Sequence, residues 1–209
     1  ATAAALTLPL AAAAETVLQI NSSLPEGSFA HVFLQEYEKQ LEAAAPGEID
    51  VQIFMSNTLG SEEDVLQGLG LGTHNASLSA SAVSQINPRT SIFDLPYLFE
   101  DRAAVQTFAG SPAGTMLAEG FDGTGMVLAA MWDNGFRQIT NKVRPIVVPA
   151  DLDGRKIRTP TNRQRVEMFN TLGANATPMS FGDVYSALDQ GTIDGQENPA
   201  QVVDSAKLY

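Results

Sequence analysis

The sequence has no cysteine, only two histidines and a single tryptophan. The lack of cysteine excludes disulfide bonds, thiolate metal ligands and cysteine nucleophiles, and it is compatible with an exported protein. His31 and His74 stand alone, without carboxylates at metal-ligand spacing, so we expect no metal and no cofactor. No nucleophile elbow or phosphate-binding loop is present, because the glycines of residues 68–72 close an expected helix rather than open one. Any enzymatic activity would therefore rest on carboxylates alone.

Basic residues are also scarce, and they are unevenly distributed. The chain holds 12 Lys and Arg against 24 Asp and Glu, for a net charge of −12. Such a protein lacks the broad basic face that nucleic acids and anionic membrane surfaces require. Yet residues 135–165 carry +6, whereas residues 1–134 carry −13 and residues 166–209 carry −5. The basic side chains of this stretch are Arg137, Lys142, Arg144, Arg155, Lys156, Arg158, Arg163 and Arg165.

The basic stretch, residues 135–165, has two interpretations. Its arginines can create a local positive field that binds an anion, because guanidinium groups recognise carboxylate and phosphate through paired hydrogen bonds. Alternatively, they are the solvated side chains of an ordinary strand–loop–strand segment. The predominance of Arg over Lys in the stretch favours anion binding.

The first fourteen residues are small and apolar. They are too short to span a bilayer, which needs about 20 residues. Three alanines before Glu15 resemble the cleavage site that follows the apolar core of a signal peptide. We therefore interpret residues 1–14 as a signal-peptide remnant and expect a periplasmic protein. The alternative is a flexible alanine-rich tail.

Hydrophobic periodicity predicts alternating strands and helices. Ser61 and Asp64 predict a capping box that opens a helix over 61–70. This alternation is typical of an α/β fold with largely parallel sheets. The charge changes sign near residue 134, which predicts a first α/β lobe over 15–134 and a second over 135–209. The expected strands are 16–21, 48–54, 75–83, 125–132, 175–179 and 191–199, and the expected helices are 28–45, 61–70, 101–119, 163–172 and 180–189.

Four segments occur in the order and spacing of one family pattern: 134–141 (NGFRQITN), 151–160 (DLDGRKIRTP), 172–181 (LGANATPMSF) and 194–199 (DGQENP). The chain resembles the solute-binding subunits of tripartite ATP-independent periplasmic (TRAP) transporters, a dicarboxylate-binding-protein-like family. The first half agrees more loosely, through LPEGSFAHVF, LGSEEDVLQGL and FDLPYLFED. The resemblance covers nearly everything after residue 14, and DGQENP and KIRTP are its most specific motifs.

The resemblance implies a two-lobed periplasmic-binding-protein-like fold with a ligand cleft between the lobes. It implies a fold that is incomplete at the C-terminus, because family members continue beyond the position of Tyr209. In such proteins an arginine on the KIR-type strand forms a two-pronged salt bridge to the ligand carboxylate, and here that residue is Arg158. The resemblance also assigns Arg137 as a second arginine on the carboxylate and Asn198 as a hydrogen-bonding partner of the same group.

Other candidates come from their positions in the chain. Phe181 and Trp132 can stack on a ligand, although core packing is the alternative for both. Ser81 lies at an expected strand end, where clefts of α/β sheets form. Arg163 lies just beyond KIRTP, and we expect it to face water.

The sequence thus predicts a protein that captures a small organic acid, a monocarboxylate or dicarboxylate, by lobe closure. The resemblance implies delivery of this ligand to a sodium-coupled TRAP membrane transporter, with no nucleic-acid partner and no direct membrane insertion of the mature chain. A lyase or hydrolase that holds a carboxylate with the same arginines is one alternative. The extracytoplasmic sensor domain of a signalling receptor is another.

Overall fold

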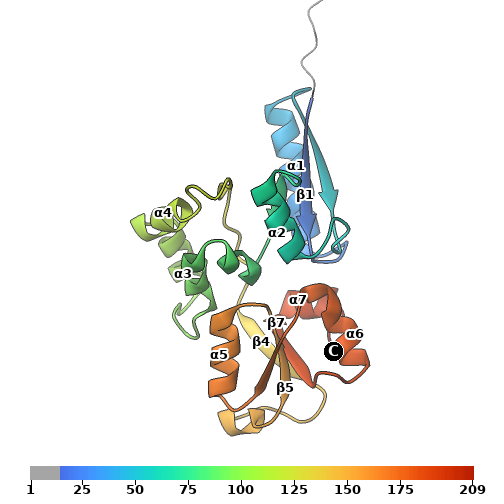
Figure 1. The fold of residues 1–209 in the computed structure, drawn as a ribbon, viewed down its shortest axis with the longest axis vertical. Helices are drawn as coiled ribbons and strands as arrows, with labels where there is room; N and C mark the ends of the chain where they lie inside the picture. Colours follow the sequence, from blue (N-terminus) through green and yellow to red (C-terminus); the bar gives the residue numbers. More distant parts are fainter. Residues whose placement is uncertain (1–14) are drawn as a thin grey trace, which may run out of the picture.

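The computed structural model describes residues 15–209, so the predicted signal-peptide remnant lies outside the described residues. Two separate sheets organise the chain (Figure 1). The first has three strands in the order β2-β1-β3, and the second has four strands in the order β4-β7-β5-β6. The strands alternate with helices, as expected for the α/β class.

The first sheet is parallel, with β1 in its centre. Apolar side chains of its strands pack against the adjoining helix in a core cluster that includes Ile20, Leu34, Val51 and Met55. The predicted strands 16–21 and 48–54 and the predicted helices 28–45 and 61–70 are confirmed, within a few residues at each end. The elements of this region are β1 Thr16–Ser22, α1 Phe29–Ala44, β2 Ile49–Phe54, α2 Glu62–Leu71 and β3 Ala76–Leu78.

Helix α2 begins and ends as its sequence predicts. The Ser61 hydroxyl accepts the Asp64 backbone N–H at 3.1 Å, and the Asp64 carboxylate accepts the Ser61 backbone N–H at 3.1 Å. Gly72 closes the helix in the left-handed region, at φ 74°, where a side chain would be strained. The glycine run is therefore the end of a helix, as expected.

Two predicted elements differ from the structure between residues 75 and 119. The expected strand 75–83 is reduced to the three residues of β3, and Ser81 instead opens the 3-10 helix η1, Ser81–Gln85. A second 3-10 helix, η2, follows at Pro88–Asp94. The expected helix 101–119 is two helices, α3 Arg102–Ala109 and α4 Pro112–Glu119. Pro112 breaks it because proline lacks the N–H that would continue α3, but fits the first turn of α4.

The predicted buried strand 125–132 is wrong. This segment has no regular secondary structure, and Val127 is 88% exposed. An apolar run becomes a strand only where a neighbouring strand offers its edge for hydrogen bonds. At that side of the first sheet β3 is only three residues long. The segment instead runs as an extended connection from α4 to β4.

The second sheet is mixed. Strand β4 is antiparallel to β7, whereas β5 is parallel to both β6 and β7. All five residues of β7 are buried, because it lies between β4 and β5. The strands are β4 Arg137–Asn141, β5 Lys156–Thr159, β6 Asn175–Pro178 and β7 Gly195–Pro199. The helices are η3 Pro149–Leu152, α5 Arg163–Thr171, η4 Phe181–Asp183, α6 Val184–Asp189 and α7 Ala200–Ser205.

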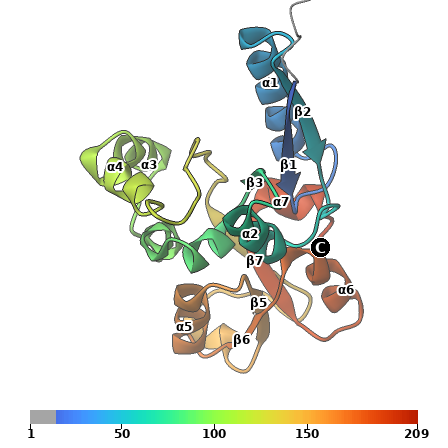
Figure 2. The ribbon, with the colours of Figure 1, turned by 45° about the horizontal axis from the view of Figure 1, so that its top comes forward.

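The two sheet regions meet through α2, η1 and η2 on one side and the residues that follow β5 and β6 on the other. Figure 2 shows α2 between the first sheet and β7. Glu63 at the start of α2 accepts hydrogen bonds from Thr161 at 2.6 Å and from Ser180 at 2.8 Å. The predicted division near residue 134 falls in the extended connection before β4, and the lobe boundaries themselves remain a prediction.

Candidate ligand-binding site

Arg158 lies in strand β5 and is only 3% exposed. Within residues 15–209, no carboxylate oxygen lies within 4.0 Å of its guanidinium group. Burial lowers the pKa of Arg158 to about 10, with Glu197 opposing the shift and Arg137 adding to it. A buried cation without a bound anion is costly. An anionic ligand would therefore be stabilised by the positive charge of this arginine.

The contacts of Arg158 leave one edge of its guanidinium available. Its Nε and Nη2 atoms both donate to the carbonyl oxygen of Met179, at 3.0 and 2.7 Å. The Phe181 ring lies 5.8 Å from the guanidinium carbon, close enough for a cation–π contact. The Nη1 atom has no hydrogen-bond partner within residues 15–209. The edge formed by Nη1 and the second N–H of Nη2 thus remains free for a two-pronged bond to a carboxylate.

Strand register places Asn198 near this arginine. Arg158 is paired with Gln196 across the parallel β5–β7 ladder, so their side chains project from the same face, and Asn198 follows two residues later on that face. Asn198 is buried, and its Nδ2 donates to Gln196 Oε1 at 2.6 Å. One N–H of the Asn198 amide is therefore left for another acceptor.

Arg137 contacts Asn198 as well, but unlike Arg158 it has an acidic partner. Its Nη2 donates to Asn198 Oδ1 at 2.8 Å and to the backbone oxygen of Glu197 at 2.7 Å. Its Nε forms a salt bridge with Glu197 Oε2. The structure thus brings Arg137 and Asn198 together as the resemblance implies, while Glu197 is an addition to the predicted set.

Glu197 also bonds to Arg165, which was not among the predicted site residues. Arg165 Nη1 donates to Glu197 Oε2 at 2.7 Å, and its Nε donates to Asp94 Oδ1 at 3.0 Å. Ser81 donates its hydroxyl to the same Asp94 oxygen at 2.7 Å. Ser81 therefore belongs to a buried polar network, and its predicted contact with a ligand remains a prediction.

An acidic residue of the first sheet region faces this cluster. Glu62, the first residue of α2, accepts the Ser23 hydroxyl at 2.7 Å and the Ala80 backbone N–H at 3.3 Å. Burial raises the pKa of Glu62, and the positive charge of Arg158 acts in the opposite direction. Within the described residues no Lys or Arg forms a salt bridge with it. In the sequence Glu62 is indistinguishable from the other acids of a helix start, which is why it was missed.

Two buried polar atoms near the carboxyl ends of β1 and β5 have no hydrogen-bond partner in the described residues. They are Asn21 Oδ1 and Thr159 Oγ1, and both residues are 0% exposed. Most buried polar groups are hydrogen-bonded in folded proteins. The carboxyl ends of parallel strands are also where ligands of α/β proteins bind.

The other predicted residues, Phe181, Trp132 and Arg163, lie in three different environments. Phe181 lies beside Arg158. Trp132 packs edge-on against Phe33 and Tyr37 and belongs to the first core cluster. These contacts match the core-packing alternative, and its stacking on a ligand remains a prediction. Arg163 is exposed and pairs with Glu167, which confirms that it faces water.

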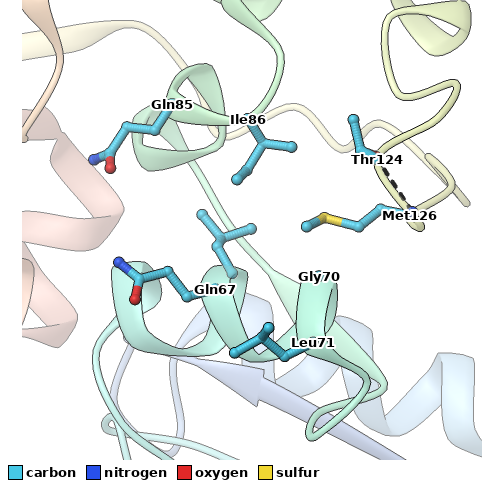
Figure 3. A pocket seen from close by; sticks show the side chains of 8 residues that line it. Gln67, Gly70, Leu71, Gln85, Ile86, Thr124 and Met126 are labelled. Carbon is cyan, nitrogen blue, oxygen red and sulfur yellow. Dashed lines mark hydrogen bonds between the residues drawn. The ribbon is translucent and has the colours of Figure 1, made fainter.

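One apolar cavity lies away from the arginines. It has a volume of about 470 Å³ and is lined by apolar side chains of α2, such as Leu66 and Leu71, together with Ile86 and Met126 (Figure 3). A smaller cavity of about 160 Å³ lies between η2, α3 and α4. Neither is lined by Arg158, Arg137 or Asn198.

None of the helices within residues 15–209 is both long and apolar enough to cross a membrane. No group of three His, Cys, Asp or Glu side chains that could hold a metal ion occurs in the same range.

Comparison with known proteins identifies the family. The family model for bacterial extracellular solute-binding proteins, family 7, matches residues 20–209. The chain belongs to this family. A solute-binding protein of Verminephrobacter eiseniae is 38% identical over 94% of the chain and 59% of its own length. The C4-dicarboxylate-binding periplasmic protein DctP of Vibrio cholerae is 37% identical over 82% of the chain and 52% of its own length.

A solved structure supports the same assignment. The TRAP periplasmic solute-binding protein of Polaromonas, bound to D-erythronate, has a TM-score of 0.88 and 34% identity, over 92% of the chain and 64% of its own. The predicted two-lobed α/β fold of the TRAP solute-binding proteins is therefore confirmed. The chain spans only about three fifths of the length of these proteins, which agrees with the expectation of an incomplete fold.

Proposed function

We propose that this family 7 protein captures a hydroxylated monocarboxylate, such as a sugar acid, between its two lobes. The proposal rests on Arg158, whose buried guanidinium has no carboxylate partner and one free edge within the part of the chain that the structure describes. Arg158 binds the ligand carboxylate through that edge. Arg137 and the free N–H of Asn198 supply further donors to the same group.

The charges of the site favour one carboxylate over two. Arg137 and Arg165 form salt bridges with Glu197 and Asp94, which leaves the positive charge of Arg158 without a directly paired acid within residues 15–209. A single carboxylate neutralises it. A second carboxylate on the ligand would require another cation, and the acid on the opposite wall, Glu62, would repel it.

Hydroxyl groups suit that opposite wall. Glu62 already accepts two hydrogen bonds, and a carboxylate has lone pairs for more. Asn21 Oδ1, near the end of β1, is an additional acceptor without a partner in the described residues. A ligand with hydroxyl donors next to its carboxylate would satisfy these acceptors, and D-erythronate is such a compound. The Polaromonas relative holds that compound, whereas the Vibrio relative is named for C4-dicarboxylates.

Delivery follows from the same two-lobed arrangement. Closure brings both lobes into one composite surface, which a membrane partner can distinguish from the open form. We propose that this surface engages the membrane subunits of a TRAP transporter in the periplasm. A protein of this kind binds and releases its ligand without making or breaking a bond.

Isothermal titration with D-erythronate, succinate and the neutral polyol erythritol tests the proposal. We expect binding of D-erythronate, weaker binding of succinate by about tenfold or more, and no binding of erythritol. A ligand present at a hundred times its Kd adds about 2.7 kcal/mol to the free energy of unfolding, so a thermal melt gives an independent readout. Equal binding of the polyol would contradict carboxylate capture, and tighter binding of succinate would contradict the preference for one carboxylate.

Glu62→Gln sharpens this test. The substitution keeps the shape of the side chain but removes the negative charge from the opposite wall. We expect the variant to lose affinity for D-erythronate and to gain affinity for succinate. Glu119→Gln, a change at an exposed acid of α4, serves as the matched control and should leave the ratio of the two affinities unchanged.

A further inference from the structure

Arg165 is a buried arginine that the proposed carboxylate site does not use directly. It lies in the first turn of α5 and is 7% exposed. Its guanidinium connects two segments far apart in the sequence, Asp94 at the end of η2 and Glu197 in β7. Burying three charged groups together costs free energy unless each is paired and held in place. Ligand binding, rather than stability, would therefore account for this buried group.

The η2 end of this connection is firmly fixed. Asp94 Oδ1 accepts from Arg165 Nε and from the Ser81 hydroxyl, and Asp94 Oδ2 accepts from Asn162 Nδ2 at 3.0 Å. Asn162 also caps α5, since its Oδ1 accepts the backbone N–H of Arg165 at 2.9 Å. Both the backbone and the side chain of Arg165 are therefore set by the same small group of residues.

The other end of the connection reaches the proposed ligand arginine. Arg165 and Arg137 both bond to the Oε2 atom of Glu197, from different sides. The Nη2 atom of Arg137 also donates to Glu197 Oε1 at 3.2 Å. The orientation of the Glu197 carboxylate thus fixes the plane of the Arg137 guanidinium, and Arg165 fixes the orientation of that carboxylate.

We propose that Arg165, held by Asp94, is a positioning residue that orients Arg137 toward the ligand carboxylate through Glu197. The inference rests on the proposed function, because it assigns Arg165 an effect on binding at that site. A site of this kind depends on the residues behind its direct contacts, since small displacements of a donor weaken a two-pronged bond.

Titration of the full chain with D-erythronate tests the proposal. Arg165→Met should raise the Kd by about tenfold. Arg163→Met, at an exposed position of the same helix, is the matched control and should leave the Kd unchanged. In an Arg137→Met background, Arg165→Met should cause no further loss, because Arg165 acts through Arg137. Equal losses in the two backgrounds would overturn the proposal.

Asp94→Asn separates positioning from a simple effect of charge. The substitution removes a negative charge near the site, so a field effect alone would tighten binding of an anion. If Asp94 acts by holding Arg165, binding weakens instead, and tighter binding would overturn the proposal. Arg165→Lys covers the case in which Arg165→Met does not fold. Lysine keeps the charge but lacks the rigid guanidinium fork that reaches both acids, so an unchanged Kd would also overturn it.

A measurement without ligand keeps this inference separate from the proposed function. The side-chain Nε–H of Arg137 is bonded to Glu197, and its hydrogen exchange can be followed by NMR. We expect strong protection in the native protein and a clear loss of protection in Arg165→Met. Unchanged protection would overturn the positioning role even if no tested acid binds. Failure of D-erythronate and succinate to bind would count against the proposed function alone.

Discussion

Three buried or half-buried arginines of the site differ in what their guanidinium groups contact. Arg137 and Arg165 each pair with an acid, whereas the hydrogen bonds of Arg158 to residues 15–209 all go to one backbone carbonyl, that of Met179. A carbonyl accepts hydrogen bonds without cancelling a full charge. The uncompensated charge at Arg158 is therefore what distinguishes a site for an anion from an internal salt-bridge network.

Arg158→Lys separates the charge of this side chain from its geometry. Lysine keeps the positive charge but cannot hold the Met179 carbonyl and a ligand carboxylate with two parallel pairs of N–H groups. We expect the Kd for D-erythronate to rise by about tenfold to a hundredfold, as measured by isothermal titration. Arg163→Lys is the control at an exposed arginine. A Kd like that of the native protein would argue against two-pronged recognition.

The residues of the site were predictable to different degrees. Arg158, Arg137 and Asn198 stood in motifs that the family resemblance singled out. Arg165 and Glu62 did not, because their importance arises from contacts between segments far apart in the chain. Asp94 and Arg165 are separated by 71 positions, and Ser23 and Glu62 by 39. No local pattern of charge or spacing predicts a contact between residues so far apart in the chain.

At the scale of elements, local rules succeeded where the element is stabilised by its own sequence. The capping box of Ser61 and Asp64 fixed the start of α2, and Gly72 fixed its end. The same rules missed the break at Pro112, although proline at a helix start is a local signal. They also gave a wrong strand over residues 125–132, because an apolar pattern does not indicate whether a neighbouring strand is present to pair with it.

Ser61→Ala tests the local control of α2. Loss of the cap leaves backbone N–H groups of the first turn without an acceptor, and such substitutions cost about 1 kcal/mol of stability. We expect a decrease of that size in the free energy of unfolding, measured with urea. Ser205→Ala, near the end of α7, is a control outside any N-terminal cap and should change it less.

Gly195 in β7 lies close to the backbone of β4. A Cβ at this position would overlap the carbonyl oxygen of Thr140 on the neighbouring strand. Gly195→Ala should therefore push β4 and β7 apart, with a loss of about 1–3 kcal/mol typical of overpacking. At Gly110 the nearest atom would lie 3.6 Å away, and its φ is −82°. Gly110→Ala should accordingly be tolerated, and similar melting temperatures for the two variants would contradict the steric explanation.

At the scale of the whole molecule, Glu63 joins the two sheet regions. It receives one hydroxyl from the segment after β5 and another from the segment after β6. Gly182 also lies close to the first region, since a Cβ there would come within 2.6 Å of Asn57 Nδ2. Contacts of this kind exist only when the two regions are together, so they favour the closed arrangement.

The titration of Glu63 gives this contact a pH dependence. Burial raises the pKa of Glu63, but hydrogen bonds from Thr161, its own backbone N–H, Ser180 and Ser61 outweigh it, so the pKa lies below its ordinary value. A carboxyl group with a lowered pKa stabilises the form that holds it above the ordinary pKa, and this contribution is lost as the pH falls through the lowered value. We therefore expect acidification to favour opening of the lobes.

Ligand affinity measured between pH 7 and pH 4 tests this expectation. The native protein should lose more affinity for D-erythronate over that range than Glu63→Gln does, since the variant has no charge to lose at this position. Titration of the ligand itself affects both proteins alike and cancels in the comparison. Parallel pH profiles for the two proteins would contradict a role of Glu63 in closure.

The strand order of the second sheet also has a consequence for the timing of assembly. β4 is the first strand of that sheet in the chain, but its partner β7 ends only at residue 199. During synthesis, Arg137 cannot meet Glu197 and Asn198 until the 60 and 61 positions that separate it from them have been made. Pairing over such long sequence separations is slow. A chain that has not yet reached β7 therefore holds Arg137 without the two residues that fix its guanidinium group, and the proposed site forms only when this late strand is added.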